Sequence, residues 1–350
     1  MSLVLHIGTG KTGTSTLQLF LRRNRERLAE LGVLYPSSPG KARHGQLSLY
    51  IRRGEELANS PHWHRPKYSE PVRFRKTFRR RLFAEIETSH LSRVLLSDEE
   101  IFKSTDAELR RLHRLTTRMA HSLRAVAYLR RQDDHMVSRY QQGVKIGWVV
   151  RLRDFAQEDM SGLYDYHARL VTHRNLLKPD ALVVRRFDPE LLTEGSLIQD
   201  FLEAAGIEAR ADQFAPVPNR NVSLDAESVE FLRLLNLHQV AHRGATPGLI
   251  DNRALSARLS EVSTGPTLTL PGQVLDAFMA QWDDSNREVA RRHFGDEPGP
   301  LFPTARKSAH TTIEQRLDPK RVGHFVEAAQ LPGDLCGPLR RLAESEADRC

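Results

Sequence analysis

The amino-acid sequence predicts an α/β protein in which helices cover both faces of a mostly parallel central sheet. Short apolar segments alternate with amphipathic ones along most of the chain, and the first of them leads through a glycine-rich loop into a helix. Strands that alternate with helices pair in parallel, because each helix carries the chain back to the same end of the sheet. With 350 residues the chain can bury a large core, as one α/β domain or as two smaller ones. We therefore expect a three-layer α/β/α fold.

The opening of the chain predicts a buried strand, a loop and a helix, in that order. Leu3 to Ile7 form a short apolar run that ends at Gly8. From Ser15 onward, leucine and phenylalanine recur at spacings of three, four and seven residues, with arginines between them. That spacing places the apolar side chains on one face of a helix.

The alternation continues to about residue 220. Apolar runs predict three more strands, at residues 93–97, 123–129 and 181–187. Helical spacing predicts the intervening and following helices, at residues 72–87, about 105–120, 132–144, 163–177 and 198–207. Residues 36–72 are rich in Pro, Gly, His and Arg, and we expect them to be mostly irregular with a short helix near 46–58.

The remaining third of the chain is predicted to be less regular. Residues 216–222 (PVPNRNV) are expected to form a loop, and helices are expected at 225–240 and 274–293 with irregular chain between them. We expect residues 1–300 to form a single α/β domain with a helical C-terminal part. Residues 301–350 are polar with several prolines, so we expect a separate appendage there, either helical or partly mobile.

Composition narrows the class of protein. Lys and Arg total 52 against 44 Asp and Glu, a net charge of +8, which suits an anionic ligand but also fits a merely basic surface. The two cysteines, Cys336 and Cys350, cannot build a disulfide framework, and no Cys/His cluster has zinc spacing. The first apolar run is too short for a signal peptide, and no apolar stretch of 18 residues occurs. We expect a cytoplasmic protein with no membrane span.

Residues 8–16 (GTGKTGTST), here called the glycine loop, predict an anion site. A loop between a strand and a helix turns backbone N–H groups toward the helix N-terminus, where the helix dipole also favours negative charge. Lys11 adds a positive charge, and hydroxyl donors follow it at Thr12, Thr14, Ser15 and Thr16. An ordinary tight turn with solvated hydroxyls is the alternative.

The glycine loop departs from the ATP-binding pattern G-x-x-x-x-G-K-[ST] at its most specific position. Gly8 and Gly13 have the required separation, but Thr14 stands where the lysine should be. Lys11 lies two residues before the last glycine instead. The loop can grip a phosphate, with its positive charge placed differently.

The stretch HIGTGKTGTSTLQ resembles the phosphosulfate-binding loop of sulfotransferases, particularly the bacterial type. In that family the loop binds 3′-phosphoadenosine 5′-phosphosulfate (PAPS), the sulfate donor. The resemblance implies that Lys11 contacts the bridging oxygen and neutralises the leaving phosphate. It implies that the donor is held by Gly10, Lys11, Thr12, Gly13, Thr14, Ser15 and Thr16.

A second stretch, YLRRQDDHMVSRY (128–140), resembles the family's motif for the 3′-phosphate. Arg130 and Ser138 are eight residues apart, as in that motif, and Asp134 falls on its Asp. An arginine that leaves a strand and a serine two helical turns later can converge on one phosphate. Arg131 and Gln132 replace the motif's Asn-Pro, and an ordinary charged strand end is the alternative. The resemblance covers roughly residues 1–220, more weakly through 164–192.

Sulfuryl transfer to an alcohol or amine calls for a base near the sulfate. LLSDEEIF resembles an S-S-E-E stretch of the bacterial relatives, and we predict Glu99 as the base. His44 is the second candidate, because the loop after the first helix borders the cleft in such folds. The alternatives are that Glu99 merely caps the next helix and that His44 is an ordinary surface residue. No metal is expected.

The sequence therefore favours a PAPS-dependent sulfotransferase that modifies a hydroxyl or amine of a small-molecule or carbohydrate acceptor. Asn219, Arg220 and Asn221 are weak candidates for closing over the nucleotide, and the basic helix at 73–81 could steer an acidic acceptor or simply be solvated. A P-loop kinase or ATPase with Asp98 on the metal is the alternative. A nucleic-acid binder is disfavoured, since acidic residues are interspersed and no stacking motif occurs.

Overall fold

The computed structural model has the predicted three-layer α/β/α architecture. It describes the chain except for residues 59–62, 64–69, 219–223, 296–298, 307–312 and 348–350. Within the described chain two compact units can be separated, each assembled from three segments. The first unit comprises residues 1–131, 160–220 and 282–304, and the second comprises residues 132–159, 221–281 and 305–350.

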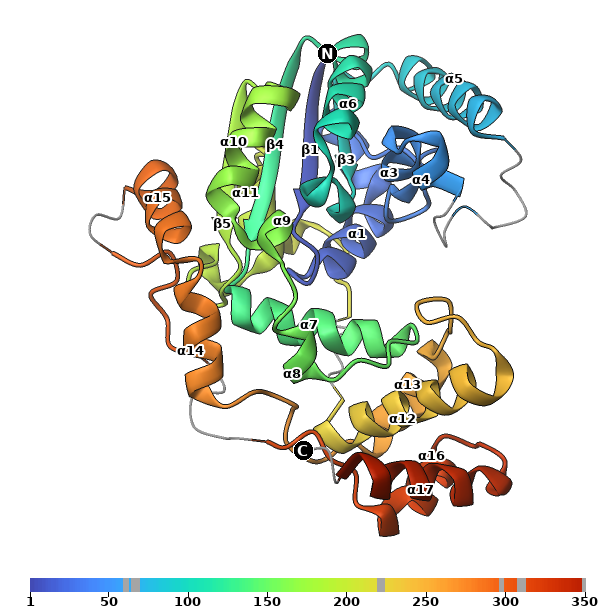
Figure 1. The fold of residues 1–350 in the computed structure, drawn as a ribbon. Helices are drawn as coiled ribbons and strands as arrows, with labels where there is room; N and C mark the ends of the chain where they lie inside the picture. The colour runs from blue at the N-terminus through green and yellow to red at the C-terminus, as the bar shows by residue number, and fades with distance from the viewer. Residues whose placement is uncertain (59–62, 64–69, 219–223, 296–298, 307–312, 348–350) are drawn as a thin grey trace. The chain divides into compact units, whose positions relative to one another are not determined.

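The first unit contains a five-stranded sheet in which every strand pairs in parallel. The strand order is β2-β3-β1-β4-β5 (Figure 1). The strands are β1 (Ser2–Gly8), β2 (Val33–Leu34), β3 (Arg93–Ser97), β4 (Ser122–Leu129) and β5 (Ala181–Arg186). Four of them match the predicted strands closely. The two-residue β2 was not predicted, because so short a strand has no periodicity to detect.

Helices cover both faces of this sheet (Figure 1). On one face, side chains of α1 (Thr14–Arg23) and α11 (Leu197–Ala204) join one buried cluster with Val4, Leu95 and Val126 of the sheet. Across the other face lie α6 (Asp106–Met119) and α10 (Tyr166–Leu177), which contact each other (Figure 1). The other helices of this unit are α2 (Arg25–Glu30), α3 (Gly45–Ile51), α4 (Gly54–Ala58), α5 (Pro71–Ser89), α9 (Ser161–Tyr164) and α15 (Asp283–Phe294).

Among the described residues of the second unit, all the regular secondary structure is helical. Its helices are α7 (Gln132–Lys145), α8 (Leu152–Phe155), α12 (Ala226–Arg243), α13 (Arg253–Val262), α14 (Gly272–Ala280), α16 (Val322–Ala328) and α17 (Cys336–Ala347). Residues 301–350 are therefore partly helical, which agrees with the first of the two alternatives predicted for them, a helical segment. This grouping differs from the predicted single domain over 1–300, since the helical unit takes segments from three regions of the chain.

Two predictions for the C-terminal third were wrong. The expected helix over 274–293 is two helices, α14 and α15, which end and begin around Trp282 and belong to different units. Trp282 is buried at the start of α15 with φ −110° and ψ 2°, a conformation that interrupts the helix. The expected irregular stretch after residue 240 contains α13, where Ser256 and Leu259 are buried.

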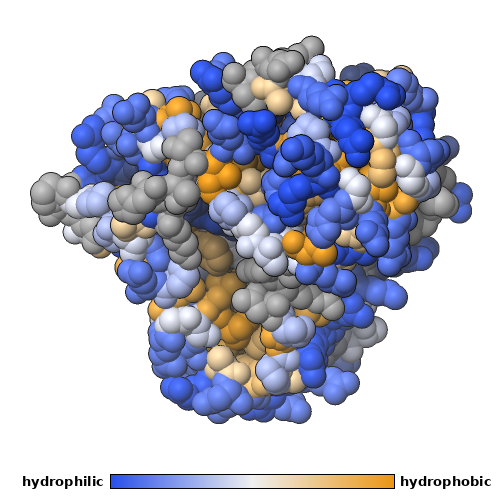
Figure 2. Space-filling model, turned by 90° about the horizontal axis from the view of Figure 1, so that it is seen from below, coloured by the Kyte–Doolittle hydropathy of each residue, from blue (hydrophilic) through white to orange (hydrophobic). Residues whose placement is uncertain are grey.

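Hydrophilic residues make up most of the outer part of the face drawn in Figure 2, and hydrophobic ones gather nearer its middle. The large hydrophobic side chains that are exposed lie on separate segments, at Val72, Leu191, Leu249 and Val274. Within the described ranges, no helix is both long and apolar enough to cross a membrane.

Candidate functional site

The glycine loop connects the central strand β1 to helix α1. Gly13 precedes α1 in the left-handed conformation, with φ 71°, and Lys11 is left-handed as well, with φ 60°. No side chain caps α1. The N-terminus of this ten-residue helix therefore lies at the loop without a capping side chain from the described residues, an arrangement that can accommodate an anion.

Two buried threonines hold the loop in place. The amide and the hydroxyl of Thr9 both donate to the carbonyl oxygen of Tyr128 in β4, at 2.8 and 3.0 Å. The Thr12 hydroxyl donates to the Thr9 carbonyl at 2.6 Å. The hydroxyl proton of Thr12 is thus used inside the loop, so this residue can serve a ligand with its amide rather than with that proton.

Two glycines let the loop pack closely against its neighbours. A Cβ on Gly8, whose φ is +106°, would lie 2.8 Å from the carbonyl oxygen of Glu99. A Cβ on Gly13 would lie 2.3 Å from Leu197 Cδ2. Any side chain at Gly8 would collide with backbone, so the loop conformation requires glycine there.

Arg130 follows β4 directly and reaches the glycine loop. Its Nη1 donates to the carbonyl oxygen of Lys11 at 2.9 Å, and its guanidinium lies 5.9 Å from the ring centre of Phe187. The Tyr166 hydroxyl donates to the Arg130 carbonyl at 2.6 Å. The residues most diagnostic of the two predicted motifs, Lys11 and Arg130, are therefore neighbours, because β1 and β4 pair side by side.

Some of the predicted site residues have no described contact with the glycine loop. Ser138 lies on α7, which belongs to the second unit, whereas the glycine loop belongs to the first. Asn219, Arg220 and Asn221 lie outside the described residues. On the loop itself Thr14 is buried, Ser15 is exposed and Thr16 is partly exposed.

Glu99 begins the 3₁₀ turn η1 (Glu99–Lys103) that follows β3, and it borders the loop. A Cβ on Gly10 would lie 3.8 Å from Glu99 Cγ. Gln18 Nε2 donates to Glu99 Oε2 at 2.6 Å, and Arg43 Nη1 lies 3.3 Å from Glu99 Oε1. Burial raises the pKa of Glu99 above its ordinary value, with the opposing influence of Arg43 reducing the rise. A raised pKa is suited to accepting a proton near neutral pH.

Asp98 has a structural role in this arrangement. It is fully buried, its Oδ1 accepts from Arg43 Nε at 3.0 Å, and its Oδ2 accepts from the Ser48 amide at 3.0 Å. A metal on Asp98 would have to displace one of these donors. In the parts of the chain that the structure describes, no group of three or more His, Cys, Asp or Glu residues could hold a metal ion.

His44 is also engaged on both ring nitrogens. Its Nδ1 accepts from the Ser97 amide at 3.1 Å, so Nε2 carries the proton and donates to the Pro36 carbonyl at 2.9 Å. Burial lowers the pKa of His44 to about 3. These contacts bind the segment before α3 to the end of β3, and they favour Glu99 over His44 as the proton acceptor.

Sequence reasoning missed Gln18, Arg43 and Phe187 as parts of this site. Gln18 lies on α1, one turn beyond Thr14, and Arg43 immediately precedes His44. Phe187 follows β5 and touches the space beside Gly13. The carboxyl ends of parallel strands lie at one edge of the sheet, so the position of Phe187 at the end of the predicted fourth strand was a usable signal.

The class that the fold defines is a three-layer α/β/α protein with an all-parallel sheet. No protein-family model matches the chain, and no solved structure matches it. A protein of Archaeoglobus fulgidus, described as an uncharacterized protein, is 29% identical to it over 171 residues. The match covers 49% of this chain and 45% of that protein, so the chain spans less than half the length of this relative.

Proposed function

We propose that the protein is a PAPS-dependent sulfotransferase that moves the sulfuryl group to a hydroxyl or amine of a small-molecule or carbohydrate acceptor. The observation that carries the proposal is the contact of Arg130 Nη1 with the Lys11 carbonyl at 2.9 Å. Two cationic residues from distant motifs meet at one edge of the sheet, where a nucleotide with phosphate groups at both ends could be held.

The residues around the loop suit an in-line displacement. The acceptor oxygen bonds to sulfur as the bond from sulfur to the 5′-phosphate oxygen breaks, which leaves 3′,5′-adenosine bisphosphate and a sulfate ester. Lys11 and the loop amides would stabilise the charge that develops on the leaving phosphate. Glu99 would take the proton from the acceptor, a contribution of about 10²–10⁴-fold in rate.

A kinase or ATPase is the second candidate, and two observations weigh against it. Lys11 does not follow the last glycine of the loop, as the ATP motif requires. Asp98, the candidate metal ligand, is already bonded through both oxygens to Arg43 and Ser48.

Calorimetry with 3′,5′-adenosine bisphosphate tests the proposal. We expect binding without magnesium, and we expect Lys11→Ala and Arg130→Ala each to weaken it by about 10- to 100-fold, because each loses a charged hydrogen-bonding partner. Glu99→Gln should keep the affinity and lower turnover. Arg27→Ala, which removes an exposed ion pair of α2, is the matched control and should bind normally.

Binding of ATP only with magnesium, together with no binding of the bisphosphate, would overturn the proposal in favour of the kinase or ATPase. Turnover that survives Glu99→Gln but is lost in His44→Gln would show that the base was misassigned.

A further inference from the structure

Glu99 is held by two side chains from separate elements. Gln18 on α1 donates to Oε2 at 2.6 Å, while Arg43, from the segment before α3, lies 3.3 Å from Oε1. Each carboxylate oxygen therefore has a different partner, and the carboxylate plane cannot rotate without losing one of them. Gln18 is 4% exposed, so its amide has little water to exchange for this contact.

Arg43 is itself fixed from behind. Its Nε donates to Asp98 Oδ1 at 3.0 Å and its Nη2 lies 2.9 Å from the same oxygen. Asp98 is in turn tied to the first turn of α3 through the Ser48 amide at 3.0 Å. The neighbouring His44 is bonded to β3 through Ser97. This chain of contacts leaves Arg43 one preferred position, beside Glu99.

We infer that Gln18 and Arg43 are positioning residues that hold the carboxylate of Glu99 in one orientation beside the glycine loop, where Glu99 Cγ lies next to Gly10. The inference deepens the proposed function, because it rests on that proposal for the role of Glu99 as base. The positioning itself depends only on the contacts among these side chains.

The alternative is that Arg43 serves only to attach the segment before α3 to β3 through Asp98. The two roles differ in what they do to the charge on Glu99. Loss of a cation or of a hydrogen-bond donor beside a carboxylate makes its ionised form less stable. Asp98 also acts on Glu99, since its negative charge opposes ionisation, and the charge of Glu99 in turn contributes to the raised pKa of Tyr35.

Carbon-13 NMR of the glutamate carboxyl groups tests this inference without ligand or turnover, and Glu99→Gln assigns the Glu99 signal. We expect Arg43→Met and Gln18→Met each to raise the titration midpoint of Glu99 by about one pH unit. Arg43→Lys should restore most of the shift, since it returns the charge. Arg27→Met is the matched control and should leave the midpoint unchanged.

Midpoints of Glu99 that stay at the unaltered value in both Arg43→Met and Gln18→Met would overturn the inference. If Arg43→Met fails to fold, Gln18→Met decides alone, because methionine keeps the side-chain volume. Absence of bisphosphate binding in the unaltered protein would instead count against the proposed function and leave the titration result standing.

Discussion

Three buried histidines, His6, His44 and His173, have lowered pKa values because they are shielded from water. Each is fully buried, and each makes at least one hydrogen bond that a neutral ring can make: His6 with the Ser97 hydroxyl, His44 with the Pro36 carbonyl, and His173 with the Phe102 carbonyl. Burial lowers the pKa of His6 and His173 to about 4, and that of His44 to about 3. All three rings are therefore neutral in the folded protein at neutral pH.

We expect acidification to destabilise the protein through these histidines. An unfolded histidine takes up a proton below its ordinary pKa of 6.5, while the buried rings do so only near 3 to 4. Their stabilising contribution is complete above pH 6.5 and is lost as the pH falls toward 4. Each can cost at most about 1.4 kcal/mol per pH unit in that window.

Urea unfolding of the unaltered protein and of His173→Gln at pH 7 and pH 5 measures this effect. Glutamine can keep the donation to Phe102 but does not titrate, so the variant should lose less free energy of unfolding between the two pH values. An equal loss in both proteins would mean that His173 binds its proton in the folded state as readily as in the unfolded one.

The glycine loop depends on backbone conformations at Gly8 and Gly13 that glycine adopts more easily than other residues. Gly8→Ala would place a methyl group 2.8 Å from the Glu99 carbonyl oxygen at a φ of +106°. We expect it to lower the free energy of unfolding by about 1–3 kcal/mol. We also expect it to weaken bisphosphate binding by at least about tenfold, since the loop would have to move away from η1.

Gly162→Ala in α9 is the control for that substitution, because nothing lies within 4 Å of its added methyl group and its φ is not positive. Thermal unfolding and calorimetry on both variants measure the effect. A Gly8→Ala protein that binds and unfolds like Gly162→Ala would show that the loop is not constrained as the structure indicates.

Elements with a strong pattern were predictable, and those without one were not. Four strands and most helices of the first unit were predicted from apolar runs and helical spacing, because burial of one face imposes these patterns. Residues 274–293 contain no proline or glycine, so the sequence showed no sign of the break at Trp282 and predicted one continuous helix. The short β2 owes its existence to pairing with β3, which is a tertiary contact.

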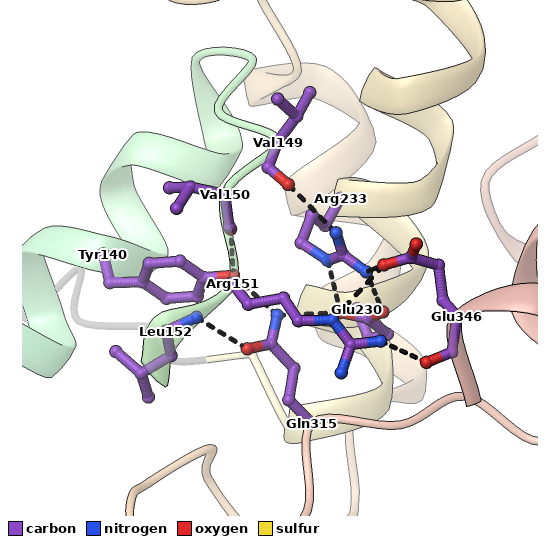
Figure 3. Close-up of polar contacts among 9 residues, drawn as sticks. All are labelled: Tyr140, Val149, Val150, Arg151, Leu152, Glu230, Arg233, Gln315 and Glu346. Carbon is purple, nitrogen blue, oxygen red and sulfur yellow. Dashed lines mark hydrogen bonds and ion pairs between the residues drawn. The ribbon is translucent and has the colours of Figure 1, made fainter. Parts of the chain in front are cut away.

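A buried polar network joins the separate segments of the second unit (Figure 3). Arg233 on α12 is 2% exposed and donates to Glu230 at 2.6 and 2.8 Å, to Glu346 at 2.7 Å and to the Val149 carbonyl at 2.9 Å. Gln315 donates to Glu230 at 2.8 Å and to the Tyr140 hydroxyl at 2.6 Å. The network ties the other two segments of this unit to α12, one through Val149 and Tyr140 and the other through Gln315 and Glu346.

Removal of one charge from this network should be costly. Glu230→Leu leaves Arg233 buried with one carboxylate fewer, and we expect a loss of about 3–5 kcal/mol in the free energy of unfolding. The double variant Glu230→Leu/Arg233→Met should recover much of that loss, because apolar replacements of similar size need no partner. Arg253→Met, in an exposed pair with Asp251, should change the stability little.

Denaturant unfolding combined with hydrogen exchange in α12 measures these differences. A Glu230→Leu protein as stable as Arg253→Met, or a double variant less stable than Glu230→Leu alone, would contradict a stabilising role for these buried charges.

Part of the candidate site could be predicted, and the remainder could not. Lys11, Glu99 and Arg130 were named because each stands in a recognisable pattern next to a strand end. Gln18 and Arg43 stand in no such pattern, and they reach Glu99 only because α1 and the segment before α3 pack beside β3. His44 was a plausible base by its position in the chain, but its burial and its two bonded nitrogens are visible only in three dimensions.

Local patterns in the sequence were enough to predict the fold class, four of the five strands and the position of the glycine loop, because periodicity and glycine placement are properties of neighbouring residues. Tertiary structure alone decided which distant side chains meet: Arg130 with Lys11, and Gln18 and Arg43 with Glu99. It also decided that the chain separates into two units, each assembled from three separate segments. The physical reason is that these contacts follow from strand order and packing, which no short window of sequence contains.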